Sequence, residues 1–258
     1  MRHMTLVRVD TDRGVTTLTL DSPHNRNALS TPLMTELLDA LAAAVADPAV
    51  RVVVLSHTGP VFCSGADLKE TAAAYASGQV PVGMLGDVLA AVVECPKPVV
   101  ARIGGPARAG GLGLVAAADI AICATEATFA FTEVRLGVIP AVISSTVLRR
   151  LSPRAAQALY LTGELFDGAR AVEIGLATAA VGAEELDATV RSYCAALVRG
   201  APGALAGTKE LLTRAPLASV REDAAELGAR SVGYFLSEEG REGVAAFREK
   251  RDPAWIPG

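Results

Sequence analysis

Glu133 is the carboxylate in this sequence best suited to chemistry, because it stands in the apolar segment Phe129–Pro140. A carboxylate in such surroundings either pairs with a cation or keeps a raised pKa and transfers protons. Arg135 and Arg149 are the candidate partners for a structural ion pair. The sequence leaves both interpretations open, so Glu133 is a candidate acid or base.

Two segments rich in small residues can supply hydrogen-bond donors from the main chain. Val61–Lys69 and Gly104–Ala116 each place glycine and alanine just before an expected helix. Backbone N–H groups at the start of a helix stabilise negative charge that develops on an oxygen. Small residues are equally suited to a tight turn that packs closely. A pair of oxyanion donors is therefore a hypothesis here, with close packing as its alternative.

A dinucleotide-binding interpretation competes for the second segment. Gly111, Gly113 and Ala116 match the pattern G-x-G-x-x-A. Glu133 follows Gly111 by 22 residues, near the position of a ribose-binding acid. The fingerprint, however, places its first glycine directly after a strand. Here seven residues, a proline among them, separate Ile103 from Gly111, so the sequence favours the backbone-donor interpretation.

Composition and spacing argue against several other classes of function. None of the three histidines lies near a G-x-S-x-G motif, and no cluster has metal-ligand spacing. The net charge of −4, with both signs interspersed, gives no basic footprint for nucleic acid. Because no apolar run spans a membrane and Met1–Asp10 lacks a signal-peptide core, we expect a cytoplasmic protein without a membrane partner. The four cysteines form no C-x-x-C pair and are expected to be reduced and mostly buried.

The elements that must position these residues follow an α/β pattern. A hairpin is expected first, then strands and helices in alternation, and a mainly helical pattern after Pro140. The expected division is a core at 1–200 and a C-terminal helical region at 201–258. The expected strands are Leu6–Val9, Val15–Leu20, Val50–Leu55, Pro98–Ile103, Ile120–Cys123 and Thr128–Phe131. The expected helices are Thr31–Ala46 with Thr31 as N-cap, Leu85–Glu94, Leu112–Ala118, one that opens at Ser152, and 184–199, 203–213, 217–236 and 238–249.

Four segments together resemble the enoyl-CoA hydratase/isomerase (crotonase) superfamily. Arg26–Leu29 is similar to the family's N-A-L motif, and Phe62–Glu70 to F-C-x-G-A-D-x-K-E. Lys97–Pro140 is similar to the block K-P-V-I-A … G-G … D-I … E-V-x-L-G-x-x-P, and Ser237–Arg251 to the C-terminus. The likeness covers nearly the whole chain. It implies an α/β fold, a crotonase-like repeated β-β-α spiral with a C-terminal helical trimerisation region, and a homotrimer or a dimer of trimers.

The same resemblance implies roles for individual residues. The backbone N–H groups of Ala66 and Gly110 would form an oxyanion hole for a thioester carbonyl, and Glu133 matches the second of two glutamates that typical hydratases use. The substrate would be an acyl-CoA thioester, so coenzyme A enters with the substrate and neither a separate cofactor nor a metal is expected. The implied substrate- and CoA-binding residues are Arg26, Ala28, Ala66, Asp67, Leu68, Lys69, Gly110, Phe247 and Lys250.

Two departures from the family pattern leave the reaction open. Gly113 stands where hydratases usually carry their first glutamate, six residues before Asp119 of the D-I pair. Pro140–Ser145 replaces a glycine-rich segment and is similar to bacterial methylglutaconyl-CoA and enoyl-CoA hydratase-like members. The leading prediction is an enoyl-CoA hydratase, which adds water syn across a 2-enoyl-CoA through an enolate. A Δ3,Δ2-enoyl-CoA isomerase, which needs one base, and a non-catalytic acyl-CoA-binding protein remain as alternatives.

Overall fold

A computed structural model describes residues 5–67, 70, 82–136, 139–213, 238–239, 242, 246 and 249–257. Within them the main sheet has the order β1-β2-β3-β4-β6-β9. Its first pair, β1 and β2, is antiparallel, and the other neighbours are parallel. The strands are β1 (Val7–Asp12), β2 (Val15–Leu20), β3 (Val52–His57), β4 (Val99–Ile103), β6 (Ile120–Ala124) and β9 (Ala179–Val181).

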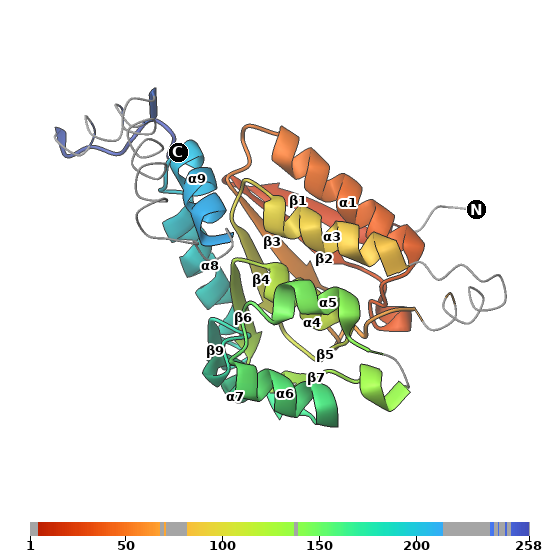
Figure 1. The fold of residues 1–258 in the computed structure, drawn as a ribbon. Helices are drawn as coiled ribbons and strands as arrows, with labels where there is room; N and C mark the ends of the chain where they lie inside the picture. The colour runs from red at the N-terminus through yellow and green to blue at the C-terminus, as the bar shows by residue number, and fades with distance from the viewer. Residues whose placement is uncertain are drawn as a thin grey trace, which may run out of the picture.

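Helices cover the main sheet on both faces, which explains why its central strands are mostly apolar. Residues 52–56 of β3, for example, are all buried. One face carries α1 (Thr31–Ala46), α3 (Val82–Glu94), α4 (Gly110–Ala117) and α5 (Ala141–Val147) (Figure 1). The other face carries α8 (Leu186–Leu197), which packs on β4 and β6, and α9 (Pro202–Thr213) lies beyond it in the chain. The sequence-derived expectation of a layered α/β core is therefore confirmed.

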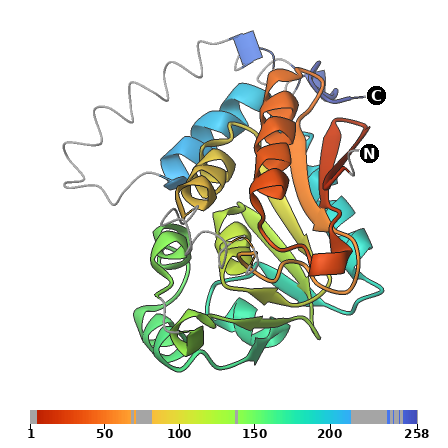
Figure 2. The ribbon, with the colours of Figure 1, turned by 90° about the vertical axis from the view of Figure 1, so that its right-hand side faces the viewer.

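A smaller sheet with the order β5-β7-β8 completes the core in the described residues. It consists of β5 (Ala107–Arg108), β7 (Thr128–Ala130) and β8 (Phe166–Asp167). Helix α7 (Gly168–Glu173) packs on β7 and β8, and α6 (Pro153–Thr162) packs on η2 (Glu133–Leu136). The short helix η1 (Pro23–Asn25) lies between β2 and α1 in the chain. Both views place α5 and α6 at the end of the molecule opposite the C-terminal residues (Figures 1 and 2).

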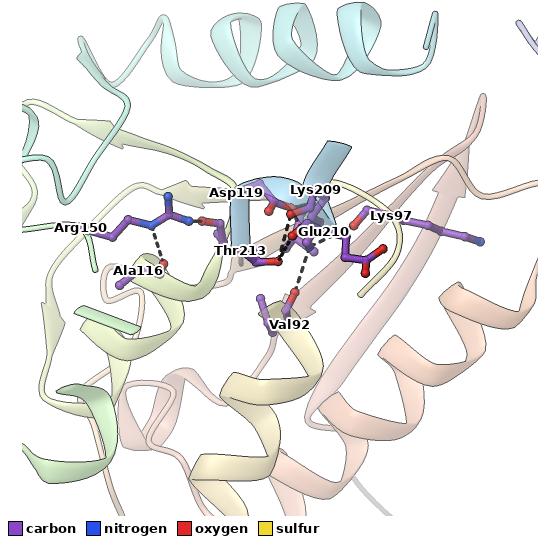
Figure 3. A network of polar contacts seen from close by, with 10 residues as sticks. Val92, Lys97, Ala116, Asp119, Arg150, Lys209, Glu210 and Thr213 are labelled. Carbon is purple, nitrogen blue, oxygen red and sulfur yellow. Dashed lines mark hydrogen bonds and ion pairs between the residues drawn. The ribbon is translucent and has the colours of Figure 1, made fainter. Parts of the chain in front are cut away.

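A buried lysine ties α9 to the sheet and to the end of α3 (Figure 3). Lys209 Nζ lies 2.8 Å from Asp119 Oδ2 and donates to the Val92 carbonyl at 3.1 Å. Asp119 Oδ2 also accepts from the Val99 N–H at 2.7 Å. From the turn that follows α5, Arg150 donates to carbonyls at the end of α4. These bonds satisfy buried carbonyls that helix ends leave without partners.

Several boundaries differ from those expected. The N-cap of α1 is Ser30, whose Oγ accepts from the Leu33 N–H, whereas Thr31 hydrogen-bonds to Glu70. The helix expected at Leu112 begins two residues earlier, at Gly110. The region after Pro140 is less helical than predicted, because it contains β8 and β9, which are too short to show an alternating pattern.

Other expectations have mixed outcomes. The hairpin and the strands expected near residues 50, 98, 120 and 128 are confirmed within a few residues. The four cysteines are free and buried, as predicted. The helix expected at 217–236 lies outside the described residues, as does most of the one at 238–249. The boundary at residue 200 falls between α8 and α9 and stays a prediction. No helix in the described part of the chain combines the length and the apolar character needed to cross a membrane.

Candidate active site

Three segments lie side by side where the candidate residues stand. Cys63 forms a parallel bridge with Ala107, and β5 pairs in parallel with β7, Ala107 opposite Phe129. Parallel neighbours direct their carboxyl ends the same way, so the residues that follow each segment meet at one edge. Ala66, Gly110 and Glu133 are among those residues.

The two candidate oxyanion donors come from loops in van der Waals contact. Gly65 has φ +90°, and a methyl group added there would lie 2.9 Å from Ala109 Cβ and 3.5 Å from the Gly110 nitrogen. One added at Gly110 would lie 3.8 Å from Gly65 Cα. Neither Ala66 N–H nor Gly110 N–H donates to another described residue. The geometry thus leaves two main-chain donors on adjacent loops with capacity for an oxygen ligand.

An asparagine holds the first of these loops in place. Asn27 is fully buried; its Nδ2 donates to the carbonyls of Thr58 and Val61, and its Oδ1 accepts from the Ser22 N–H. Arg26 and Asn27 both have positive φ, a conformation that asparagine tolerates better than most residues. The Arg26 carbonyl accepts from the Ser64 N–H. The N-A-L motif therefore frames the Ala66 loop, a role the sequence analysis did not assign to Asn27.

The second loop is strained where α4 begins. Ala109 has φ 47° and ψ −118°, a conformation that costs a residue with a Cβ, and it precedes the first helical residue, Gly110. The Leu112 N–H bonds to the Ala109 carbonyl, and the Ala109 N–H bonds to the Ala130 carbonyl of β7. These contacts fix the direction of the peptide that carries the Gly110 N–H.

Glu133, the first residue of η2, is buried without an ionic partner in the described structure. Its side chain is 8% exposed, and Oε2 has no hydrogen-bond partner. Burial raises the pKa of this carboxyl, and a hydrogen bond from its own backbone N–H opposes the shift. Arg135 donates to the Thr162 carbonyl and Arg149 to the Thr213 carbonyl. The ion-pair interpretation of Glu133 is therefore wrong, and a raised pKa suits a base that works near neutral pH.

Apolar side chains fill the space beside Gly113, where the first glutamate of a hydratase is expected. A methyl group there would lie 2.7 Å from Ile143 Cγ2 and 3.2 Å from Leu89 Cδ1. One at Gly111 would lie 2.9 Å from Cys63 Cβ. Both glycines are inside α4 and permit close packing. The dinucleotide interpretation is wrong, because its glycines belong to a packed helix and not to a turn after a strand.

The remaining predicted binding residues fall into three groups. Exposed Arg26 and buried Ala28 lie beside the Ala66 loop, since the Leu29 N–H donates to the Gly65 carbonyl, and Asp67 accepts from Asn25. Lys250 is exposed in 249–257, a segment joined to Arg51 and Arg199 through Trp255, and its expected contact with the CoA of a neighbouring subunit stays a prediction. Three residues lie outside the described part: Leu68, Lys69 and Phe247.

Tyr160 is a further polar residue near Glu133 that the sequence analysis missed. Its ring centroid lies 4.6 Å from that of Phe131, and its hydroxyl is buried without a hydrogen-bond partner. Burial raises the pKa of this phenol; the Ser144 hydroxyl opposes the shift and the charge of Glu133 adds to it. Ser144 Oγ itself donates to the Pro140 carbonyl at 2.7 Å. A single tyrosine in an amphipathic helix gives no signal by which a sequence pattern could have identified it.

No group of three or more His, Cys, Asp or Glu side chains in the described ranges is arranged to hold a metal ion. The candidate residues described above are two loop amides, one carboxylate and one phenol.

Comparison with known proteins agrees with this arrangement. The family model described as enoyl-CoA hydratase/isomerase matches residues 10–257. A crystal structure of an enoyl-CoA hydratase from Mycobacterium avium is 47% identical, with a TM-score of 0.75 and coverage of 98% of this chain and 99% of that one. A carnitinyl-CoA dehydratase of Proteus mirabilis is 33% identical, covering 95% of this chain and 96% of its own. A peroxisomal Delta(3,5)-Delta(2,4)-dienoyl-CoA isomerase of Arabidopsis thaliana is 30% identical, covering 98% and 96%.

These matches span nearly the whole chain and confirm both the resemblance and the crotonase-like α/β fold predicted from the sequence motifs. The relatives catalyse more than one reaction, judged by their names, so they do not decide between hydration and isomerisation. The chain belongs to the enoyl-CoA hydratase/isomerase family.

Proposed function

We propose that this protein is an enoyl-CoA hydratase, which adds water across the C2–C3 double bond of a 2-enoyl-CoA thioester. The observation that carries the proposal is the buried carboxylate of Glu133, which has a free oxygen and no cation beside it in the described structure. Glu133 follows β7, which pairs with β5, and the Gly110 loop that follows β5 is in contact with the Ala66 loop. Enolate chemistry requires a base and hydrogen-bond donors that stabilise the enolate oxygen.

The proposed mechanism begins at the thioester oxygen. The N–H groups of Ala66 and Gly110 bind this oxygen and stabilise its negative charge, each contributing about 3 kcal/mol in the transition state. Carbonyl polarisation makes C3 electrophilic. Glu133 takes a proton from water as the water oxygen bonds to C3, and the π electrons move to form the enolate. Glu133 then returns the proton to C2, so the elements of one water molecule are added on one face.

A second candidate is a Δ3,Δ2-enoyl-CoA isomerase, and the packing at Gly113 favours it. Because Ile143 and Leu89 occupy the space beside Gly113, a second carboxylate has no place there. Isomerisation moves one proton between C4 and C2, so one carboxylate is sufficient. The same loop amides would stabilise the dienolate that forms between the two transfers.

The two candidates are separated by incubation with a 2-enoyl-CoA and, in parallel, with a 3-enoyl-CoA. Hydration removes the ultraviolet absorbance of the conjugated thioester, whereas isomerisation creates it. We expect loss of absorbance with the 2-enoyl-CoA. A gain with the 3-enoyl-CoA, and no change with the 2-enoyl-CoA, would establish the isomerase instead. An inactive protein that still binds acyl-CoA, with the same affinity after Glu133→Gln, would support the non-catalytic alternative.

A further inference from the structure

Two buried polar atoms at the candidate site have no partner in the described structure. They are Oε2 of Glu133 and the hydroxyl oxygen of Tyr160. Buried polar groups in folded proteins are nearly always hydrogen-bonded, so each such exception calls for an explanation. A third unpartnered atom, His57 Nδ1, belongs to a ring whose Nε2 accepts from the Gly104 N–H, and it lies in another part of the fold.

The packing of α6 on η2 brings the phenol and the carboxylate into one neighbourhood. The Tyr160 ring stacks at a tilt on Phe131, two residues before Glu133. At the end of α6, a methyl group added to Gly163 would lie 3.0 Å from the Phe131 carbonyl oxygen, so the helix and the segment before η2 are in direct contact. The negative charge of Glu133 contributes to raising the pKa of the Tyr160 phenol.

Neighbouring side chains do not fully satisfy either atom. The Ser144 hydroxyl is close enough to lower the pKa of the Tyr160 phenol, but it donates its proton to the Pro140 carbonyl and makes no well-formed hydrogen bond to Tyr160. The rings of Phe131 and Phe166 are apolar and lie tilted against one another. A tyrosine phenol is protonated at neutral pH, and burial raises the pKa of Tyr160 further, so its hydroxyl is a donor, whereas ionised Glu133 is an acceptor. A buried donor and a buried acceptor on segments that pack together are suited to a small ligand that both accepts and donates, such as water.

We propose that the Tyr160 hydroxyl holds the nucleophilic water by donating a hydrogen bond to its oxygen, while Glu133 Oε2 accepts a proton from the same water. This inference rests on the proposed hydratase function and adds a second catalytic residue to it. In the reverse direction the same phenol binds the departing C3 hydroxyl.

The step balances with Tyr160 unchanged. One O–H bond of water breaks, its proton passes to Glu133, and a lone pair of the water oxygen forms the bond to C3. The phenol keeps its own proton throughout, so its role is to orient the oxygen and to replace hydration lost on burial. With Tyr160 in this role, the lone carboxylate needs no partner at the position of Gly113.

Tyr160→Phe tests the proposal because it removes the hydroxyl and keeps the ring on Phe131. We expect kcat for hydration of a 2-enoyl-CoA to fall about tenfold to a hundredfold, the effect of one hydrogen bond to a reacting group, with KM little changed. Exchange of the C2 proton of a saturated acyl-CoA in heavy water uses Glu133 and the loop amides but no nucleophilic water. It should continue at the wild-type rate.

Tyr193→Phe is the matched control, since Tyr193 is a partly buried tyrosine on α8, on the other face of the main sheet. It should hydrate at the wild-type rate. If the wild type hydrates and Tyr160→Phe hydrates equally fast, the inference fails and the proposed function stands. If Tyr160→Phe loses exchange together with hydration, the phenol supports Glu133 or the fold and does not hold water. A wild type that isomerises but does not hydrate overturns both proposals.

Discussion

Two buried polar clusters in this molecule differ in how completely their atoms are paired. Around Lys209 the ammonium contacts Asp119 and donates to the Val92 and Lys97 carbonyls, and Asp119 accepts from a backbone N–H (Figure 3). Around Glu133 a carboxylate oxygen and the Tyr160 hydroxyl have no partner in the described structure. In the first cluster, all three donors of the Lys209 ammonium have acceptors, so the cluster joins α9 to the core. In the second, a donor and an acceptor are left for the proposed water.

The largest expected effect comes from removing the charge in the unsatisfied cluster. Glu133→Gln keeps the shape of the side chain and removes the base, so hydration should fall by roughly 10²–10⁴-fold. Steady-state kinetics with a 2-enoyl-CoA measure this effect, and circular dichroism should show an intact fold. Activity within a few fold of the wild type would mean that Glu133 is merely a buried structural carboxyl.

Removing the charge of Lys209 should lower the free energy of unfolding and leave the catalytic rate unchanged. Lys209→Met leaves Asp119 without its cation, and breaking a buried pair costs roughly 3–5 kcal/mol, the lower end applying because the Asp119 side chain is 23% exposed. Urea unfolding monitored by circular dichroism gives the change in the free energy of unfolding. The residual folded protein should keep the wild-type kcat, since the cluster makes no contact with the candidate residues in the described structure.

Arg170→Met provides the matched control for that measurement. Arg170 forms an ion pair with Glu173 in which both side chains are well exposed to solvent. Exposed pairs contribute about 1 kcal/mol or less, so this variant should unfold close to the wild type. Equal losses in the two variants would mean that burial does not distinguish the Lys209 pair.

A smaller effect is expected at the helix that lies beside both clusters. Arg150 bonds to the end of α4, and Gly113 in the middle of α4 packs on Ile143. Gly113→Ala should destabilise the protein by about 1–3 kcal/mol, because the new methyl group overpacks the core. In an Ile143→Ala background, which is itself destabilised by the cavity it creates, the same Gly113→Ala change should cost less free energy of unfolding. An equal cost in both backgrounds would mean that Ile143 is not what confines residue 113.

The sequence pointed to residues in short motifs and missed residues that are defined by contacts between distant segments. Ala66, Gly110 and Glu133 stand in motifs whose residue types are set by short-range geometry, so the pattern could name them as candidates. Asn27 and Tyr160 depend on contacts with segments 31 or more residues away or on another element, and no local periodicity encodes such contacts. The strands β8 and β9 escaped prediction for the same reason, since pairing partners and not their own few residues define them.

The smallest of the expected effects is the pH dependence of the free energy of unfolding, which also tests the contrast between the two clusters. Burial raises the pKa of Glu133, so the folded protein binds this proton more tightly than the unfolded chain does. The cost of ionising Glu133 is therefore absent below the ordinary glutamate pKa, grows as the pH rises toward the folded pKa, and is fully present above it.

Glu133→Gln removes this cost, so its stability relative to the wild type should increase from acidic to neutral pH. Urea midpoints of both proteins at pH values of about 4 and about 8, on either side of the titration, measure the difference. The hydration rate of the wild type should rise through the same pH window, because the base works only when ionised. If the stability difference between the two proteins stays constant while the hydration rate rises, a group other than Glu133 titrates in this window. Glu133 would then not be the buried, unpaired carboxylate that distinguishes the two clusters.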